Sequence, residues 1–183
     1  MAVVGWLSLH ALVTRGGFRI RSEEEGGRGL LRAALLATLL AGAVALFDLQ
    51  VVFPRGINVP FPRSLLFYPA IALVAEVAFH ALPLALLLLG VVLVGGARRW
   101  EGVVLYALAV VALLEPLFQL GFPSAAALPA WGRIYLGVHL LVFNGLQLWI
   151  FRRHDFLSMY AFRLVYYGWW HVAWGHARLE LLF

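Results

Sequence analysis

The sequence predicts an all-α fold, a polytopic transmembrane helical bundle of about five spans plus a short N-terminal helix. Of its 183 residues, 63% are hydrophobic and only 13% are charged, whereas soluble domains carry about 45–50% apolar and about 25% charged residues. The hydrophobic residues also form several runs of about 20, the length that a helix needs to cross a lipid bilayer. We therefore expect lipid to surround most of the chain.

Five apolar runs qualify as spans, with approximate bounds 30–53, 65–97, 102–121, 131–151 and 156–182. They are joined by short connections, so we expect a single integral membrane domain over residues 1–183.

Two segments depart from this regular pattern. Residues 1–14 are apolar, but at 1.5 Å per residue they cover about 21 Å against a bilayer core of about 30 Å. They are expected to form either a short span or an interfacial helix. The run 65–97 is too long for one straight span, and Pro69 and Pro83 can kink it.

The charge pattern excludes some functions and predicts an orientation. The net charge of +5 comes from short arginine clusters between apolar runs, so we expect no nucleic-acid partner. Without cysteine, the chain has no disulfide, thiolate metal site or cysteine nucleophile. Arginine-rich short loops stay in the cytoplasm, which places loops 15–32, 98–101 and 152–155 on the cytoplasmic side of a prokaryotic-type cytoplasmic membrane.

Ionisable side chains inside the apolar runs are the candidates for function, because a charge at the bilayer centre costs at least about 2.5–3.5 kcal/mol. With the nearby amides, they are Glu76, His80, Glu115, His139, Asn144, Gln147, Arg163, His171 and His176. Counting residues from the span ends places Glu76, His80, His139 and His171 in one slab near mid-membrane. A carboxylate beside imidazoles can activate water. Alternatively, the same residues could form hydrogen bonds between helices that only stabilise the bundle.

The remaining polar residues receive narrower predictions. Glu76 and His80 are four residues apart and share a helix face. Arg163 could hold a substrate carboxylate or pair with Glu76 or Glu115, and Tyr166 or Tyr167 could donate to a bound carbonyl. Asp48, near a helix end, is expected to touch water.

Four blocks of the sequence, over roughly residues 65–176, resemble the CAAX-protease and bacteriocin-processing family (type II CAAX endopeptidase, Abi-like) of intramembrane proteases. Residues 75–80 (AEVAFH) are similar to the family's E-E-x-x-x-R helix, and 135–139 (YLGVH) to its F-x-x-x-H helix. Residues 145–153 are similar to the G-L-x-x-G-x-x-x-x-R run, and 171–175 (HVAWG) to the final H-x-x-x-N.

The resemblance implies an intramembrane peptidase. Glu76 would be the general base, His139 would orient the water and His171 would stabilise the oxyanion. His80, Arg163, Asn144 and Tyr167 would be accessory or substrate-binding residues. The sequence departs from the motifs at three positions, with Ala75 at the first Glu, His80 at the Arg and Gly175 at the Asn.

Two further interpretations stay open. Glu76, His80, His139 and His171 could bind a divalent metal such as Zn or Fe, or histidine pairs could bind haem. Alternatively, the chain could be a non-catalytic subunit of a larger membrane complex, with its buried Glu, His and Arg as structural pairs. The expected partners are membrane lipid and either a peptide, prenylated or membrane-embedded protein substrate, or other membrane subunits.

Overall fold

A computed structural model describes residues 1–23, 26–95 and 100–183, and this part of the chain forms helices and loops with no strand. Four helical stretches are long and apolar enough to cross a membrane: Gly27–Val51, Ser64–Val91, Gly102–Leu120 and Ala130–Arg153. They coincide with the first four predicted spans, so the all-helical class is confirmed, and four of the predicted spans have the length and composition that a membrane crossing needs.

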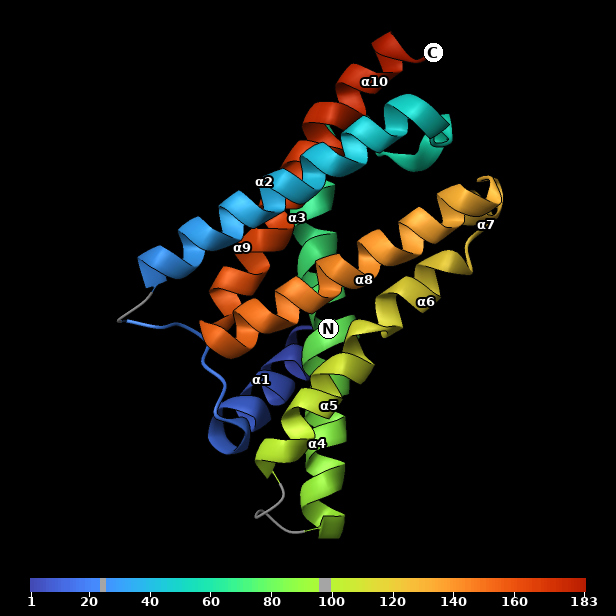
Figure 1. The fold of residues 1–183 in the computed structure, drawn as a ribbon. Helices are drawn as coiled ribbons and strands as arrows, with labels where there is room; N and C mark the ends of the chain where they lie inside the picture. Colours follow the sequence, from blue (N-terminus) through green and yellow to red (C-terminus); the bar gives the residue numbers. More distant parts are fainter. Residues whose placement is uncertain (24–25, 96–99) are drawn as a thin grey trace.

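The chain begins with two helices that lie in different parts of the molecule (Figure 1). Helix α1 (Ala2–Gly16) ends where Gly17 adopts φ 63°, a conformation that glycine tolerates best. Helix α1 packs against the long rod that follows α2, and α2 (Gly26–Val51) packs along the C-terminal helices. Gly5 permits a close approach, because a Cβ there would lie 2.8 Å from Val77 Cγ2.

The second predicted span is one rod with an irregular middle. It consists of α3 (Ser64–Ala75), the π-helical segment η2 (Glu76–Ala81) and α4 (Leu82–Gly95). Pro83 has no N–H for the usual bond to the carbonyl four residues back, and the preceding Leu82 N–H bonds to Val77 O, five residues back. The expected disturbance between Pro69 and Pro83 therefore takes the form of a π-helical turn.

The next helices continue the bundle in chain order. They are α5 (Trp100–Ala112), α6 (Leu114–Leu120), the single turn α7 (Pro123–Ala126) and α8 (Ala130–Arg153). The short 3₁₀ turn η1 (Arg55–Ile57) lies earlier, in the loop between α2 and α3.

The C-terminal helical run consists of α9 (Phe156–Tyr167), the second π-helical segment η4 (Gly168–Trp174) and α10 (Gly175–Leu181). Asp155 caps α9, since its Oδ1 accepts from Ser158 N at 2.6 Å. This fifth predicted span is not among the four stretches that are long and apolar enough to cross a membrane, because Arg163 and several Tyr, Trp and His residues lower its hydropathy.

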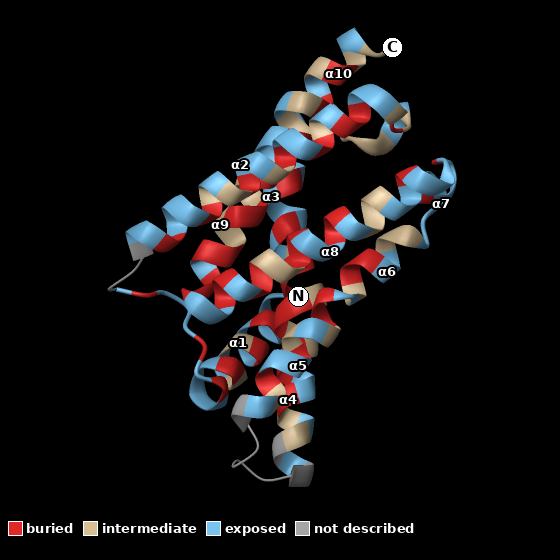
Figure 2. Ribbon diagram, in the orientation of Figure 1, coloured by how far each residue is buried: buried red, intermediate tan, exposed pale blue. Residues whose placement is uncertain are grey.

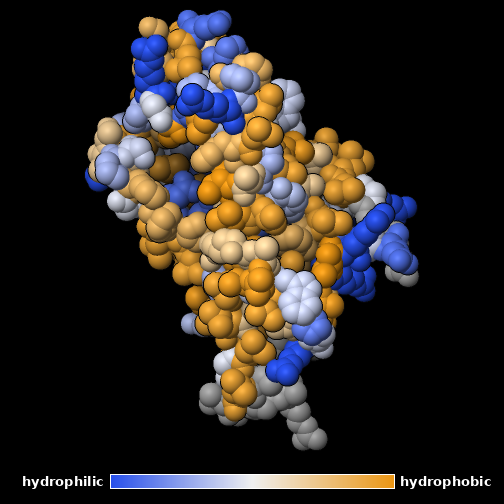
Figure 3. Space-filling view, turned by 180° about the vertical axis from the view of Figure 1, so that it is seen from behind, coloured by the Kyte–Doolittle hydropathy of each residue, from blue (hydrophilic) through white to orange (hydrophobic). Residues whose placement is uncertain are grey.

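Buried residues gather where α2, α8, α9 and the α3–α4 rod meet (Figure 2). Large apolar side chains such as Leu39, Leu66 and Leu105 face outward, and hydrophobic side chains cover most of the face shown in Figure 3. Hydrophilic side chains are concentrated at its upper end and along one edge. This distribution suits a body surrounded by lipid.

Candidate functional site

The two π-helical segments carry three of the predicted site residues. Segment η2 begins at Glu76 and includes His80, and η4 includes His171. π-helical turns are rare and occur often at functional sites. Their side chains have very different surroundings.

Glu76 and His80 belong to a polar network in which both are 0% exposed. His80 Nδ1 donates to Glu76 Oε2 at 2.7 Å, and His80 Nε2 donates to Asn144 Oδ1 at 2.7 Å. The other oxygen of Glu76, Oε1, accepts from Arg163 Nε at 2.7 Å and also from the side-chain amide of Gln147. The predicted contact between Glu76 and His80 is thus confirmed.

The orientation of the Asn144 amide determines whether His80 Nε2 donates or accepts the hydrogen bond between them. Asn144 Nδ2 donates to Leu140 O at 2.8 Å, so its Oδ1 is the atom that faces the ring. Both nitrogens of His80 therefore face acceptor oxygens, an arrangement that satisfies an imidazole with hydrogen on both nitrogens.

Arg163 is the centre of the network and pairs with both predicted carboxylates. Its Nη1 donates to Glu115 Oε1 at 2.9 Å and Tyr167 Oη at 3.0 Å. Its Nη2 donates to Glu115 Oε2 at 2.7 Å and Gln147 Oε1 at 2.8 Å. Together with Nε on Glu76, these bonds use all five guanidinium N–H groups. Of the two predicted roles of Arg163, the structure shows the pairing with Glu76 and Glu115, which leaves no N–H for a substrate carboxylate.

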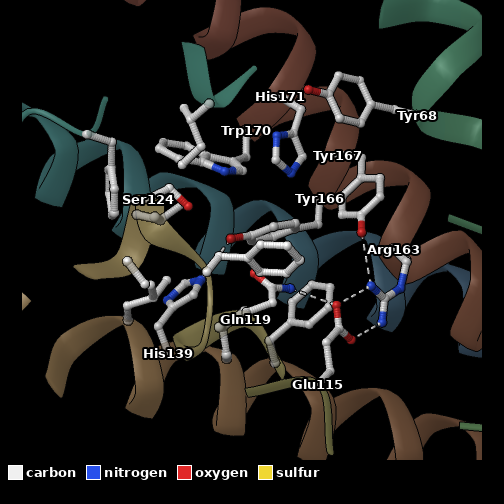
Figure 4. Close-up of a pocket in the computed structure, with 18 of the residues that line it drawn as sticks. Tyr68, Glu115, Gln119, Ser124, His139, Arg163, Tyr166, Tyr167, Trp170 and His171 are labelled. Carbon is white, nitrogen blue, oxygen red and sulfur yellow. Dashed lines mark hydrogen bonds and ion pairs between the residues drawn. The ribbon is translucent and has the colours of Figure 1, made fainter. Parts of the chain in front are cut away.

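A cavity of about 270 Å³ lies beside this network, between α3, α6, α8 and the α9–η4 run (Figure 4). Most of its wall is apolar or aromatic. Its polar lining residues are Tyr68, Glu115, Gln119, Ser124, His139, Arg163, Tyr166, Tyr167 and His171. Among the described residues, Glu76 and His80 lie behind this wall rather than in it.

His139 reaches the cavity from α8. Its Nε2 is hydrogen-bonded to Tyr166 Oη at 2.9 Å, and its Nδ1 lies 3.5 Å from Tyr135 Oη. His139 and Tyr166 thus form a hydrogen-bonded pair across two helices.

His171 reaches the same cavity from η4, and its ring points toward the middle of the view in Figure 4. Its Nδ1 donates to Asn58 Oδ1 at 2.6 Å, and its ring stacks on Tyr68 with centroids 4.4 Å apart. Its Nε2 has no hydrogen-bond partner within the part of the chain that the structure describes. His176 is exposed and contacts Phe61 instead.

The structure therefore divides the predicted site into two parts. Glu76, His80, Asn144, Arg163 and Tyr167 share the network, whereas His139 and His171 line the cavity without joining the network. Arg163 and Tyr167 belong to both, since they also line the cavity. The metal site predicted from Glu76, His80, His139 and His171 is not assembled. Glu76 and His80 bond to each other in the network, whereas His139 bonds to Tyr166 and His171 bonds to Asn58. No group of three or more His, Asp or Glu suited to a metal occurs over residues 1–23, 26–95 and 100–183.

Sequence reasoning also missed Asn58 and misplaced Asp48. Asp48 is 0% exposed, and its two oxygens accept from Arg178 at 2.6 and 2.9 Å. Trp174 Nε1 and Phe53 N also donate to it, each at 2.7 Å. The prediction that Asp48 touches water is wrong, because Arg178 reaches it from a helix 130 residues away. For Asn58, no local signal indicated a partner 113 residues away.

Comparisons of this chain with family models, curated proteins and solved structures find no match. The resemblance to the CAAX-protease and bacteriocin-processing family thus stays a prediction, and function must be argued from the site.

Proposed function

We propose that this chain is an integral membrane endopeptidase that hydrolyses a peptide bond of a membrane-embedded substrate in the cavity. The observation that carries the proposal is that His139 and His171, on two different helices, line one cavity beside a fully paired ionic network. We place the protein in a prokaryotic-type cytoplasmic membrane with its arginine-rich loops on the cytoplasmic side, and with α9 to α10 as a fifth span.

In this proposal the general base is His171 rather than Glu76. Both oxygens of Glu76 already accept hydrogen bonds, whereas Nε2 of His171 is unpartnered among the described residues. A water molecule attacks the peptide carbonyl and gives a proton to Nε2. Breaking of the C–N bond returns that proton to the leaving amine, so the products are a carboxylic acid and an amine.

Tyr166 is placed to stabilise the oxyanion of the tetrahedral intermediate. When His139 Nε2–H donates to Tyr166 Oη, the phenol O–H is free to donate into the cavity. His139 then acts as the residue that holds this donor in position.

The cavity lining also favours an internal peptide bond over a chain end. Arg163 is the guanidinium in the wall, and all its N–H groups are used by protein acceptors. Among the described lining residues, a free C-terminal carboxylate would find no unpaired arginine or lysine, so exclusion of a charged terminus supports an endopeptidase acting on an apolar segment.

The test uses the purified full chain in lipid nanodiscs with a library of quenched fluorescent apolar peptides whose ends are capped. We expect cleavage by the wild type and loss of at least about 10²-fold in kcat for His171→Gln, since general-base catalysis contributes about 10²- to 10⁴-fold. His176→Gln, the same change on an exposed residue five positions along the chain, is the matched control. Full activity of His171→Gln would overturn the assignment.

A second candidate function is a non-catalytic subunit of a membrane complex. The observation that favours it is the closed network, in which Glu76, His80 and Arg163 are each 0% exposed and bonded to one another. Failure of the wild type to cleave any capped peptide of the library would favour this candidate over the peptidase.

A further inference from the structure

Asn58 lies in the loop between α2 and α3, and protein contacts hold this loop on both sides of it. On the N-terminal side, Arg178 bonds to Asp48 and also donates to Phe53 O at 2.5 Å and Pro54 O at 3.3 Å. On the C-terminal side, Val59 N donates to Tyr68 Oη at 2.8 Å. The position of Asn58 is thus set by α2, α3 and α10 together.

The side chain of Asn58 lies between the ring of His171 and the backbone of Gly175. Its Oδ1 accepts from His171 Nδ1 at 2.6 Å. A Cβ added at Gly175 would lie 2.9 Å from Asn58 Nδ2 and 3.1 Å from its Cγ. The absence of a side chain at 175 is therefore what leaves room for the amide beside the ring.

Tyr68 restricts the orientation of the His171 ring from another side. It stacks on His171 at an interplanar angle of 14°, and its hydroxyl group accepts the bond from Val59, next to Asn58. One tyrosine therefore fixes both the plane of the imidazole and the loop that carries its acceptor.

We propose that Asn58 is the positioning residue of His171, holding the ring in the tautomer with hydrogen on Nδ1 and a lone pair on Nε2 directed into the cavity. A carbonyl-type oxygen can only accept, so its bond to Nδ1 requires the hydrogen there and leaves Nε2 able to take a proton. The catalytic consequence rests on the proposed hydrolysis, whereas the tautomer does not.

The first test is ¹⁵N NMR of histidine-labelled protein in nanodiscs, with the His171 signals assigned by their loss in His171→Gln. We expect hydrogen on Nδ1 and none on Nε2 in the wild type and in Asn58→Asp, which keeps an acceptor oxygen. Asn58→Leu has a similar volume without an acceptor, and we expect it to give a mixture of tautomers. Hydrogen on Nε2 in the wild type, or an unchanged pattern in Asn58→Leu, would overturn the proposal.

Gly175→Ala provides a second route that leaves Asn58 chemically intact. Its Cβ would displace the amide, so we expect the same mixture of tautomers as in Asn58→Leu. Gly168→Ala is the matched control, because it lies in the same helical run and its added Cβ meets nothing within 4 Å. If Gly175→Ala keeps the wild-type pattern while folded, Asn58 does not act through this contact.

Kinetics then separate the positioning role from the proposed function. With capped peptides, we expect Asn58→Leu to lower kcat by at least about 10-fold with little change in KM, and Asn58→Asp to recover most of it. A wild type without hydrolysis whose tautomer still depends on Asn58 would reject the hydrolase and keep the positioning role. A hydrolase whose kcat is unchanged in Asn58→Leu would reject the positioning role alone.

Discussion

The two π-helical segments share one backbone irregularity but place their histidines in opposite surroundings. In η2, Glu76 and His80 are 0% exposed, and every side-chain oxygen or nitrogen that they present is bonded to the protein. In η4, His171 is only partly buried. One of its ring nitrogens is hydrogen-bonded to Asn58, and the other faces a cavity. In a low-dielectric interior, a closed polar cluster stabilises a bundle, whereas a reactive group must keep one site unpartnered.

The largest expected effect comes from breaking the closed cluster at its centre. Arg163→Leu leaves Glu76 and Glu115 buried without their shared cation, so we expect the free energy of unfolding to fall by about 3–5 kcal/mol. Chemical unfolding in detergent micelles measures it. The control is Arg133→Leu, because Arg133 is exposed; equal losses in the two variants would contradict a cluster organised around Arg163.

The same substitution in both segments tests the comparison directly. His80 bonds to both Glu76 and Asn144, and His80→Gln removes one of these two hydrogen bonds. We expect the free energy of unfolding to fall by about 1.5–3 kcal/mol, as for hydrogen bonds to charged groups. His171→Gln removes one hydrogen bond to a neutral group, Asn58, so we expect the free energy of unfolding to fall by about 0.5–1.5 kcal/mol.

Activity should rank these two variants in the reverse order. We expect His171→Gln to lose kcat while staying folded, and folded His80→Gln to keep most of its kcat. If His80→Gln instead loses activity without losing stability, the closed cluster takes part in the chemistry and the division between the two segments fails.

A small effect is also expected where the two regions meet, at Tyr167. Its hydroxyl accepts one bond from Arg163 at 3.0 Å and also lines the cavity. Tyr167→Phe should therefore cost about 1 kcal/mol of unfolding free energy, with Tyr106→Phe as the control because Tyr106 is 74% exposed. A loss of several kcal/mol would show that Arg163 depends on this neutral acceptor as much as on its carboxylates.

Local patterns explain which parts could be predicted. Apolar run length located four helices within a few residues, because lipid demands continuous apolar surface. The spacing of four between Glu76 and His80 predicted their contact, and the cost of a lone intramembrane charge predicted a carboxylate partner for Arg163.

Contacts between distant segments explain what could not be predicted. Asp48 and Asn58 lie near helix ends in the sequence, where side chains usually meet water, yet Arg178 and His171 come from the far end of the chain to bond them. The separation of Glu76 from His139 and His171 likewise depends on how helices rotate about their axes, which depth along a helix does not determine. For the same reason, residues that share a slab of the membrane need not share a site.

The short helix α1 has a consequence for how the polar network is shielded. Its Gly5 lies directly against Val77, the residue after Glu76 in η2, and α1 packs on both η2 and α4. Exposing a charged group to hydrocarbon is costly. With α1 in place, the side of η2 that carries Val77 meets a second helix instead of the surroundings of the bundle.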